Sequence, residues 1–143
     1  MIIMDMFPFE EESFTKYFNK MKEEKKYLET EKRAWGQYMV LLDTPMCKVK
    51  AIQVEPGHRL SYQYHTKRAE NWTIVNGKAT ITLDDEKIFR EKGESVRIPL
   101  GARHRIANES EEKLMFIEVQ TGESFDEEDI VRLEDDYGRE VDK

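Results

Sequence analysis

The chain has 143 residues and a mass of 17.0 kDa, which predicts a single domain with its own hydrophobic core. It carries 23 basic and 30 acidic residues, so the formal net charge is −7. A nucleic-acid-binding surface would usually show a basic excess, so this balance favours a small ligand over nucleic acid. The single cysteine, Cys47, cannot form an internal disulfide, and no apolar run is long enough to span a bilayer. We therefore expect no membrane partner and a cytoplasmic location.

The N-terminal part predicts one amphipathic helix over residues 10–27. Phe14, Tyr17, Phe18 and Met21 recur at helical spacing, and glutamate and lysine fill the positions between them. We assign residues 1–33 to an N-terminal helical extension and residues 34–143 to a β-barrel, within one domain overall.

From Trp35 onward the hydrophobic period changes to two, and short runs follow one another at the spacing of an all-β sandwich or barrel. Strands are predicted near 36–43, 48–54, 59–65, 71–76, 78–83, 86–89, 95–98, 104–108 and 113–120. Asn76-Gly77 predicts a two-residue hairpin, because both residues tolerate positive φ. The acidic C-terminal tail predicts a short helix around 126–134.

Four side chains of this region form a candidate metal-binding set: Gln63, His65, Glu70 and His104. Side chains alternate along a strand, so Gln63 and His65 share a face, and Glu70 can join them after a turn. Two imidazoles, a carboxylate and an amide oxygen suit a divalent cation such as Zn, Co, Mn, Ni, Fe or Mg. The alternative is a pair of core histidines with satisfied hydrogen bonds and a solvated Glu70.

The glycine spacing around these residues resembles the paired motifs of the cupin superfamily. The first motif runs from Gly57 through Gln63, His65 and Glu70 to Gly77, with Gln63 where many cupins have histidine. The second contains Gly93, Pro99, Gly101, His104 and Asn108 without a gap. The resemblance implies a double-stranded β-helix, that is, a jelly-roll barrel.

Five segments resemble the C-terminal isomerase domain of type II phosphomannose isomerases: AWGQY at 34–38, the run at 49–72, IPLGARHRIAN at 98–108, IEVQTGE at 117–123 and EEDIVRLEDDYGR at 127–139. The resemblance implies a divalent metal and the interconversion of mannose 6-phosphate and fructose 6-phosphate. The guanylyltransferase domain that usually precedes this domain is absent from these residues, so no GTP binding is expected. Thr66, Lys67 and Asn71 stand where the family often has histidine.

For that reaction Arg68 is the candidate cationic helper, because it lies in the stretch that the family uses for catalysis. Lys67 or Glu118 is the candidate proton shuttle, and each could instead be a surface residue or half of an ion pair. Arg103 and Arg105 flank His104 and are candidates for phosphate binding, since guanidinium groups match phosphate oxygens in pairs. The alternative for both arginines is ordinary surface charge.

Two other functions compete with a metal-dependent sugar-phosphate isomerase. One is a non-catalytic sugar- or nucleotide-sugar-binding cupin, which the missing histidines around Arg68 support. The other is a small-cupin dioxygenase, which Gln63 in place of a third histidine weakens. The family resemblance also suggests a homodimer that pairs through an edge strand. Alternatively, the N-terminal helix covers part of this exposed edge.

Overall fold

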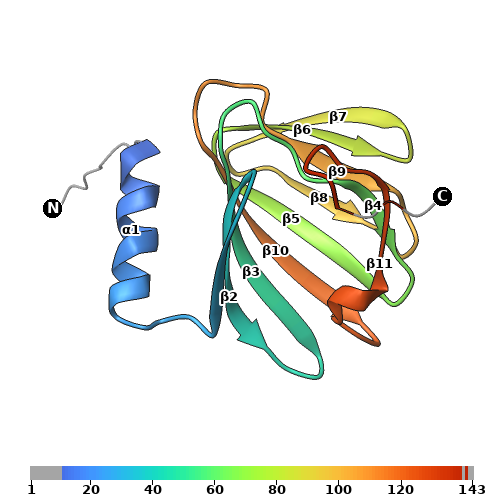
Figure 1. Ribbon diagram of the computed structural model, residues 1–143, viewed down its shortest axis with the longest axis horizontal. Coiled ribbons are helices and arrows are strands. Elements are labelled where there is room, and N and C mark those ends of the chain that lie inside the picture. The colour runs from blue at the N-terminus through green and yellow to red at the C-terminus, as the bar shows by residue number, and fades with distance from the viewer. Residues whose placement is uncertain (1–10, 140, 142–143) are drawn as a thin grey trace, which may run out of the picture.

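Two antiparallel sheets face each other in the computed structural model, which describes residues 11–139 and 141 (Figure 1). The elements in chain order are α1 (Glu11–Glu23), β1 (Glu29–Arg33), β2 (Gly36–Asp43), β3 (Cys47–Val54), β4 (Tyr62–His65), β5 (Arg68–Asn76), β6 (Lys78–Leu83), β7 (Glu86–Glu91), β8 (Ser95–Ile98), β9 (His104–Ala107), β10 (Leu114–Gly122), the 3₁₀ turn η1 (Glu127–Asp129) and β11 (Ile130–Glu134). The all-β fold class predicted from the period-two patterns is confirmed.

The six-stranded sheet has the order β1-β2-β3-β10-β5-β8, and the five-stranded sheet has the order β11-β4-β9-β6-β7. Because side chains alternate along each strand, every second residue points between the sheets. The core contains Ile52, Ile74 and Phe116 from the first sheet and Ile81 and Ile106 from the second, all buried. This apolar packing fixes the distance between the sheets, and therefore the position of polar side chains on the same inner faces.

The chain does not form the predicted hairpin at Asn76-Gly77. β5 pairs with β10 and β8, whereas β6 pairs with β9 and β7, so the chain passes from one sheet to the other at this point. Gly77 has a φ of 84°, and a Cβ at this position would lie 2.7 Å from the carbonyl oxygen of Lys113. The tight hairpin instead joins β6 to β7 through Asp84 and Asp85, whose φ angles of 47° and 70° suit a two-residue loop.

The predicted N-terminal helix is confirmed as α1, although its expected start at residue 10 lies outside the described residues. Phe18 is buried against Met39, Ala51 and Met115, which lie on the outer face of the six-stranded sheet. These contacts place the helix on a face of this sheet rather than on an edge. Figure 1 shows the helix on the side of the molecule where β2 lies. The segment assigned to the extension also contains β1, which pairs with β2 at the sheet edge.

The predicted helix at 126–134 is wrong. A single 3₁₀ turn, η1, is followed by strand β11, which pairs with β4 and extends the five-stranded sheet. Ile130 and Val131 are β-branched and favour a strand. The free edge of β4 supplies backbone hydrogen-bond partners for this strand. Within the described part of the chain, no helix is long and apolar enough to cross a membrane.

Candidate metal centre

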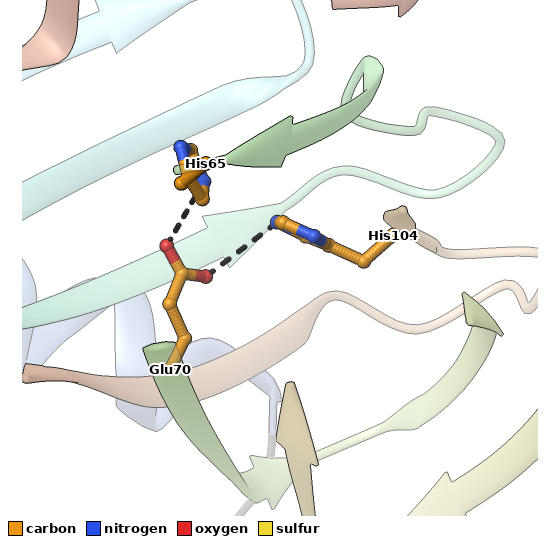
Figure 2. Close-up of side chains that lie close together, drawn as sticks. All are labelled: His65, Glu70 and His104. Atoms are coloured by element: carbon orange, nitrogen blue, oxygen red, sulfur yellow. Dashed lines mark ion pairs between the residues drawn. The ribbon is translucent and has the colours of Figure 1, made fainter. Parts of the chain in front are cut away.

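Three strands carry the predicted ligands into the interior of the barrel, β4 and β9 from the five-stranded sheet and β5 from the six-stranded sheet. Gln63 and His65 lie on β4, Glu70 lies on β5 after a short turn, and His104 begins β9. Gln63 is the direct cross-strand partner of His104, so their side chains emerge side by side. Figure 2 shows both imidazoles directed at the carboxylate of Glu70. The structure thus brings together residues that are about 40 positions apart in the sequence.

The spacing of the three side chains suits one small cation. His65 Nε2 lies 3.2 Å from Glu70 Oε2, and His104 Nε2 lies 3.8 Å from Glu70 Oε1. One ligand atom from each residue lies within 4.8 Å of the others. Ligands about 2.0–2.2 Å from a tetrahedral zinc ion would be separated by roughly 3.3–3.6 Å, so these distances fit a shared ion.

The hydrogen bonding of His104 prepares Nε2 as a ligand. Its Nδ1 lies 2.9 Å from the carbonyl oxygen of Ala102, an acceptor, so Nδ1 carries the proton and Nε2 presents a lone pair. Nε2 is buried and has no hydrogen-bond partner among the described residues. A lone pair that faces a carboxylate oxygen is repelled unless a cation lies between them. This pair of opposed acceptors is the strongest geometric sign of a metal site.

The ionisation states agree with this assignment. Burial lowers the pKa of His104, which keeps its imidazole neutral, and the charge of Glu70 only partly opposes this effect. Burial alone would raise the pKa of Glu70, but the close contact with His65 and the guanidinium charge of Arg68 hold that pKa well below its usual value. A neutral imidazole and an ionised carboxylate are the forms that bind a metal.

Gln63 lies at the border of this cluster. Its Nε2 atom is 3.4 Å from His65 Nε2, and its Oε1 atom is 2.5 Å from the hydroxyl of Ser61. A hydroxyl can donate or accept, so turning the amide over would keep the bond to Ser61 and point Oε1 at His65. Gln63 can therefore serve as a fourth, weaker oxygen ligand.

Arg68 lies inside the same cluster and is 3% exposed. Its Nε donates to Glu70 Oε2 at 3.0 Å, and its Nη2 lies 3.3 Å from His65 Nε2. The remaining nitrogen, Nη1, is buried and has no acceptor among the described residues. The guanidinium thus adds a fixed positive charge beside the candidate ligands.

A second buried carboxylate, Glu118 on β10, is connected to the first through Trp72. The indole Nε1 of Trp72 donates to Glu70 Oε1 at 3.0 Å and to Glu118 Oε1 at 3.1 Å. Gln120 donates to the other oxygen of Glu118 at 2.8 Å. Burial, followed by the negative charge of Glu70, raises the pKa of Glu118 to about 8, although Lys50 opposes the shift.

A cavity opens beside this network between the two sheets. Its lining includes Gln63, Arg68 and Glu118 together with Lys50 and Glu127, which form an ion pair at 2.8 Å. Three further arginines complete its charged wall: Arg33, Arg132 and Arg139. Sequence reasoning missed Lys50, Gln120 and these three arginines, because only strand pairing places them near the histidines.

The other predicted site residues lie elsewhere. Lys67 is exposed in the turn between β4 and β5 and does not line the cavity. Arg103 pairs with Asp84 and Asp85 on the outside of the barrel. Arg105 is buried, but its guanidinium donates to the carbonyl oxygen of Leu60 and to Glu134, and it does not line the cavity either.

A jelly-roll barrel with a buried His/Glu/His cluster in its interior defines a protein of the cupin class. The fold agrees with a solved cupin-superfamily sugar phosphate isomerase from Silicibacter pomeroyi, with a TM-score of 0.55 and 20% identity over 59% of this chain and 58% of that one. At this identity the likeness concerns the fold alone. The expected double-stranded β-helix is confirmed.

The sequence profile described as "Mannose-6-phosphate isomerase C-terminal" matches residues 20–135, and the chain belongs to this family. The xanthan biosynthesis protein XanB of Xanthomonas campestris is 45% identical over 107 residues, which are 75% of this chain and 23% of XanB. The mannose-1-phosphate guanylyltransferase ManC of Salmonella typhimurium is 43% identical over 107 residues, 75% of this chain and 22% of ManC. The chain therefore spans less than a quarter of the length of these curated relatives.

Proposed function

We propose that this chain is a metal-dependent sugar-phosphate isomerase that interconverts mannose 6-phosphate and fructose 6-phosphate. The main support is that two hydrogen-bond acceptors, His104 Nε2 and Glu70 Oε1, face each other. They lie beside a cavity lined by Glu118, a carboxyl group with a raised pKa. Membership of the isomerase C-terminal family and the mannose-1-phosphate enzymes among the relatives support the choice of sugar. A cytoplasmic location stays a prediction.

We assign one divalent cation to His65, Glu70 and His104, with Gln63 as the fourth ligand. The donor set of two imidazoles, a carboxylate and an amide oxygen fits Zn, Co, Mn, Ni or Fe, and less closely Mg, which prefers oxygen ligands alone. A bound cation of this kind would supply a Lewis acid that stabilises negative charge on the substrate oxygens.

The protein's own residues must move a proton from C2 of the open-chain aldose to C1, while the hydroxyl proton of O2 passes to O1. We assign the carbon-to-carbon transfer to Glu118 rather than to the exposed Lys67, because Glu118 lines the cavity. Its pKa is raised above the usual carboxyl value by burial, as suits a carboxyl group that takes the proton and returns it. Arg68 would stabilise the intermediate enediolate with its fixed positive charge.

The decisive experiment measures solvent-deuterium incorporation into mannose 6-phosphate and fructose 6-phosphate by NMR, using metal-reconstituted protein. We expect exchange that is lost in His104→Ala and kept in His58→Ala, because His58 lies outside the cluster and contacts Tyr137. Glu118→Gln should bind metal normally but lose at least two orders of magnitude in exchange rate. If neither sugar exchanges with Zn, Co, Mn or Mg while the metal still binds, the chain is a sugar-binding module instead.

A further inference from the structure

The cavity beside the candidate metal centre is lined by more cationic than anionic side chains, although the whole chain is acidic. Five cationic side chains line it, namely Arg33, Lys50, Arg68, Arg132 and Arg139, together with two carboxylates, Glu118 and Glu127. The chain as a whole has a formal net charge of −7. A local excess of positive charge in such a chain points to an anionic ligand.

Four of these five cations already have a carboxylate partner. Lys50 pairs with Glu127 at 2.8 Å and Arg68 with Glu70 at 3.0 Å. Arg33 pairs with Glu31 at 2.7 Å and Arg139 with Asp135 at 2.8 Å. The fifth, Arg132, forms no side-chain hydrogen bond and no ion pair within 4.0 Å in residues 11–139 and 141, and its Nε is buried without an acceptor.

Strand register places Arg132 on the same face of the five-stranded sheet as the candidate ligands Gln63 and His104. Arg132 on β11 is the cross-strand partner of Gln63 on β4, and Gln63 is the partner of His104 on β9. The three side chains therefore form one row across the sheet. Two strand spacings, roughly 10 Å, separate the backbones of Arg132 and His104.

The surroundings of Arg132 leave its charge only partly compensated. Burial lowers its pKa, and the positive charges of Arg139 and Arg33 act in the same direction, against Asp135 and Glu127. An arginine nevertheless stays charged in proteins. A partly buried guanidinium without an anionic partner therefore raises the free energy of the folded chain, and a bound anion would lower it. Arg33 and Arg139 approach the same cavity from β1 and from the segment after β11.

We propose that Arg132, with Arg33 and Arg139 beside it, forms the subsite for the phosphate group of the substrate. Guanidinium groups bind phosphate oxygens through paired, charge-assisted hydrogen bonds, and Arg132 has donors that no group in the described part of the chain accepts. The identity of the ligand as a sugar phosphate rests on the proposed function, whereas the position of the anion rests on the cavity itself. This subsite differs from the sequence-based assignment to Arg103 and Arg105.

The test is isothermal titration of mannose 6-phosphate, inorganic phosphate and unphosphorylated mannose into the full chain. We expect Arg132→Gln to weaken binding of both phosphate-containing ligands by about tenfold to a hundredfold, and Arg33→Gln to weaken it less. The matched control, Arg103→Gln, removes an arginine held by carboxylates outside the cavity and should leave binding unchanged. Arg132→Lys keeps the charge without the paired donors and should recover only part of the affinity.

Three outcomes would overturn the subsite: no measurable binding of either phosphate ligand to the wild-type chain, wild-type binding by Arg132→Gln and Arg33→Gln, or loss confined to Arg103→Gln or Arg105→Gln. Thermal melts show whether each variant is folded, and Arg33→Gln alters a partly exposed side chain that the core does not require. Phosphate binding that depends on Arg132 without any proton exchange would leave the subsite standing and reject the isomerase.

Discussion

Asp135 shows how one residue can fix the wall of the cavity. Its carboxylate is fully buried and accepts hydrogen bonds from Arg139, at 2.7 Å from the backbone nitrogen, 3.1 Å from Nε and 2.8 Å from Nη2. The side-chain bonds from Arg139 are the largest cause that holds the pKa of Asp135 below its usual value. Asp135 therefore positions Arg139, although it does not line the cavity itself.

The folded-state pKa of Asp135 is depressed, so its contribution to stability is present above the unfolded pKa of about 3.9 and is lost as the pH falls through the folded value. Asp135→Asn should cost about 1–3 kcal/mol at pH 7, which is a decrease of several degrees in Tm. The difference in Tm between Asp135→Asn and wild type should become smaller below about pH 4. Circular dichroism melts from pH 7 to pH 3 measure it.

Asp43→Asn is the matched control, because Asp43 is an exposed carboxylate whose nearest cation, Lys48, lies 4.0 Å away. We expect it to change stability by less than about 0.5 kcal/mol. A constant Tm difference between Asp135→Asn and wild type over the whole pH range would contradict the linkage.

At the scale of elements, η1 and β11 fix the turn that connects the ligands. Asp129 accepts hydrogen bonds from the backbone nitrogens of Thr66 and Lys67 at 3.1 and 2.8 Å, and from the hydroxyl of Thr66 at 2.6 Å. This turn separates His65 from Glu70, so it sets the distance between two of the candidate ligands. The C-terminal segment thus stabilises a site to which it contributes no ligand.

Asp129→Asn should weaken metal binding by about tenfold, because an amide nitrogen cannot accept the bonds that one carboxylate oxygen now accepts. Titration calorimetry with Zn²⁺ or Co²⁺ gives the affinity directly. Glu128→Gln changes an exposed neighbour on the same turn and should bind like wild type. Equal affinities for the two variants would show that the turn holds its shape without Asp129.

At the scale of the whole molecule, metal binding should raise the thermal stability of the chain, measured as Tm. A cation that binds only the folded chain at 100 times its Kd adds about 2.7 kcal/mol, a rise of several degrees in Tm for a chain of this size. The rise should vanish with a chelator and in His104→Ala but persist in His58→Ala. An unchanged Tm with all of Zn, Co, Mn and Ni would argue for the alternative of two core histidines.

The homodimer stays a prediction, and the sheet topology shows where it could form. β1 and β8 are the edges of the six-stranded sheet, and β7 and β11 are the edges of the five-stranded sheet. Light scattering coupled to size-exclusion chromatography should give twice the 17.0 kDa chain mass. A mass of one chain at micromolar concentration would reject the dimer and leave these edges to be protected by their charged residues.

The sequence by itself determined the class of fold and named the candidate metal ligands, which stay a prediction as ligands. Period-two runs predict strands because the alternation of side chains is local, and the same alternation places Gln63 and His65 on one face. The helix α1 was equally readable from its amphipathic spacing. The C-terminal segment was misread, because Ile130 and Val131 become a strand only when β4 offers an edge.

Only the tertiary structure decided which distant residues share the cavity. Local patterns could not reveal that Asn76-Gly77 connects two different sheets. A residue with positive φ occurs in a hairpin and also where the chain passes from one sheet to the other. Nor could they place Arg132 beside Gln63, because register between strands depends on the packing of the whole core. Side-chain direction is local, whereas proximity in a barrel depends on which strands pair. The candidate ligands could therefore be named from the sequence, but the arginines that line the cavity could not.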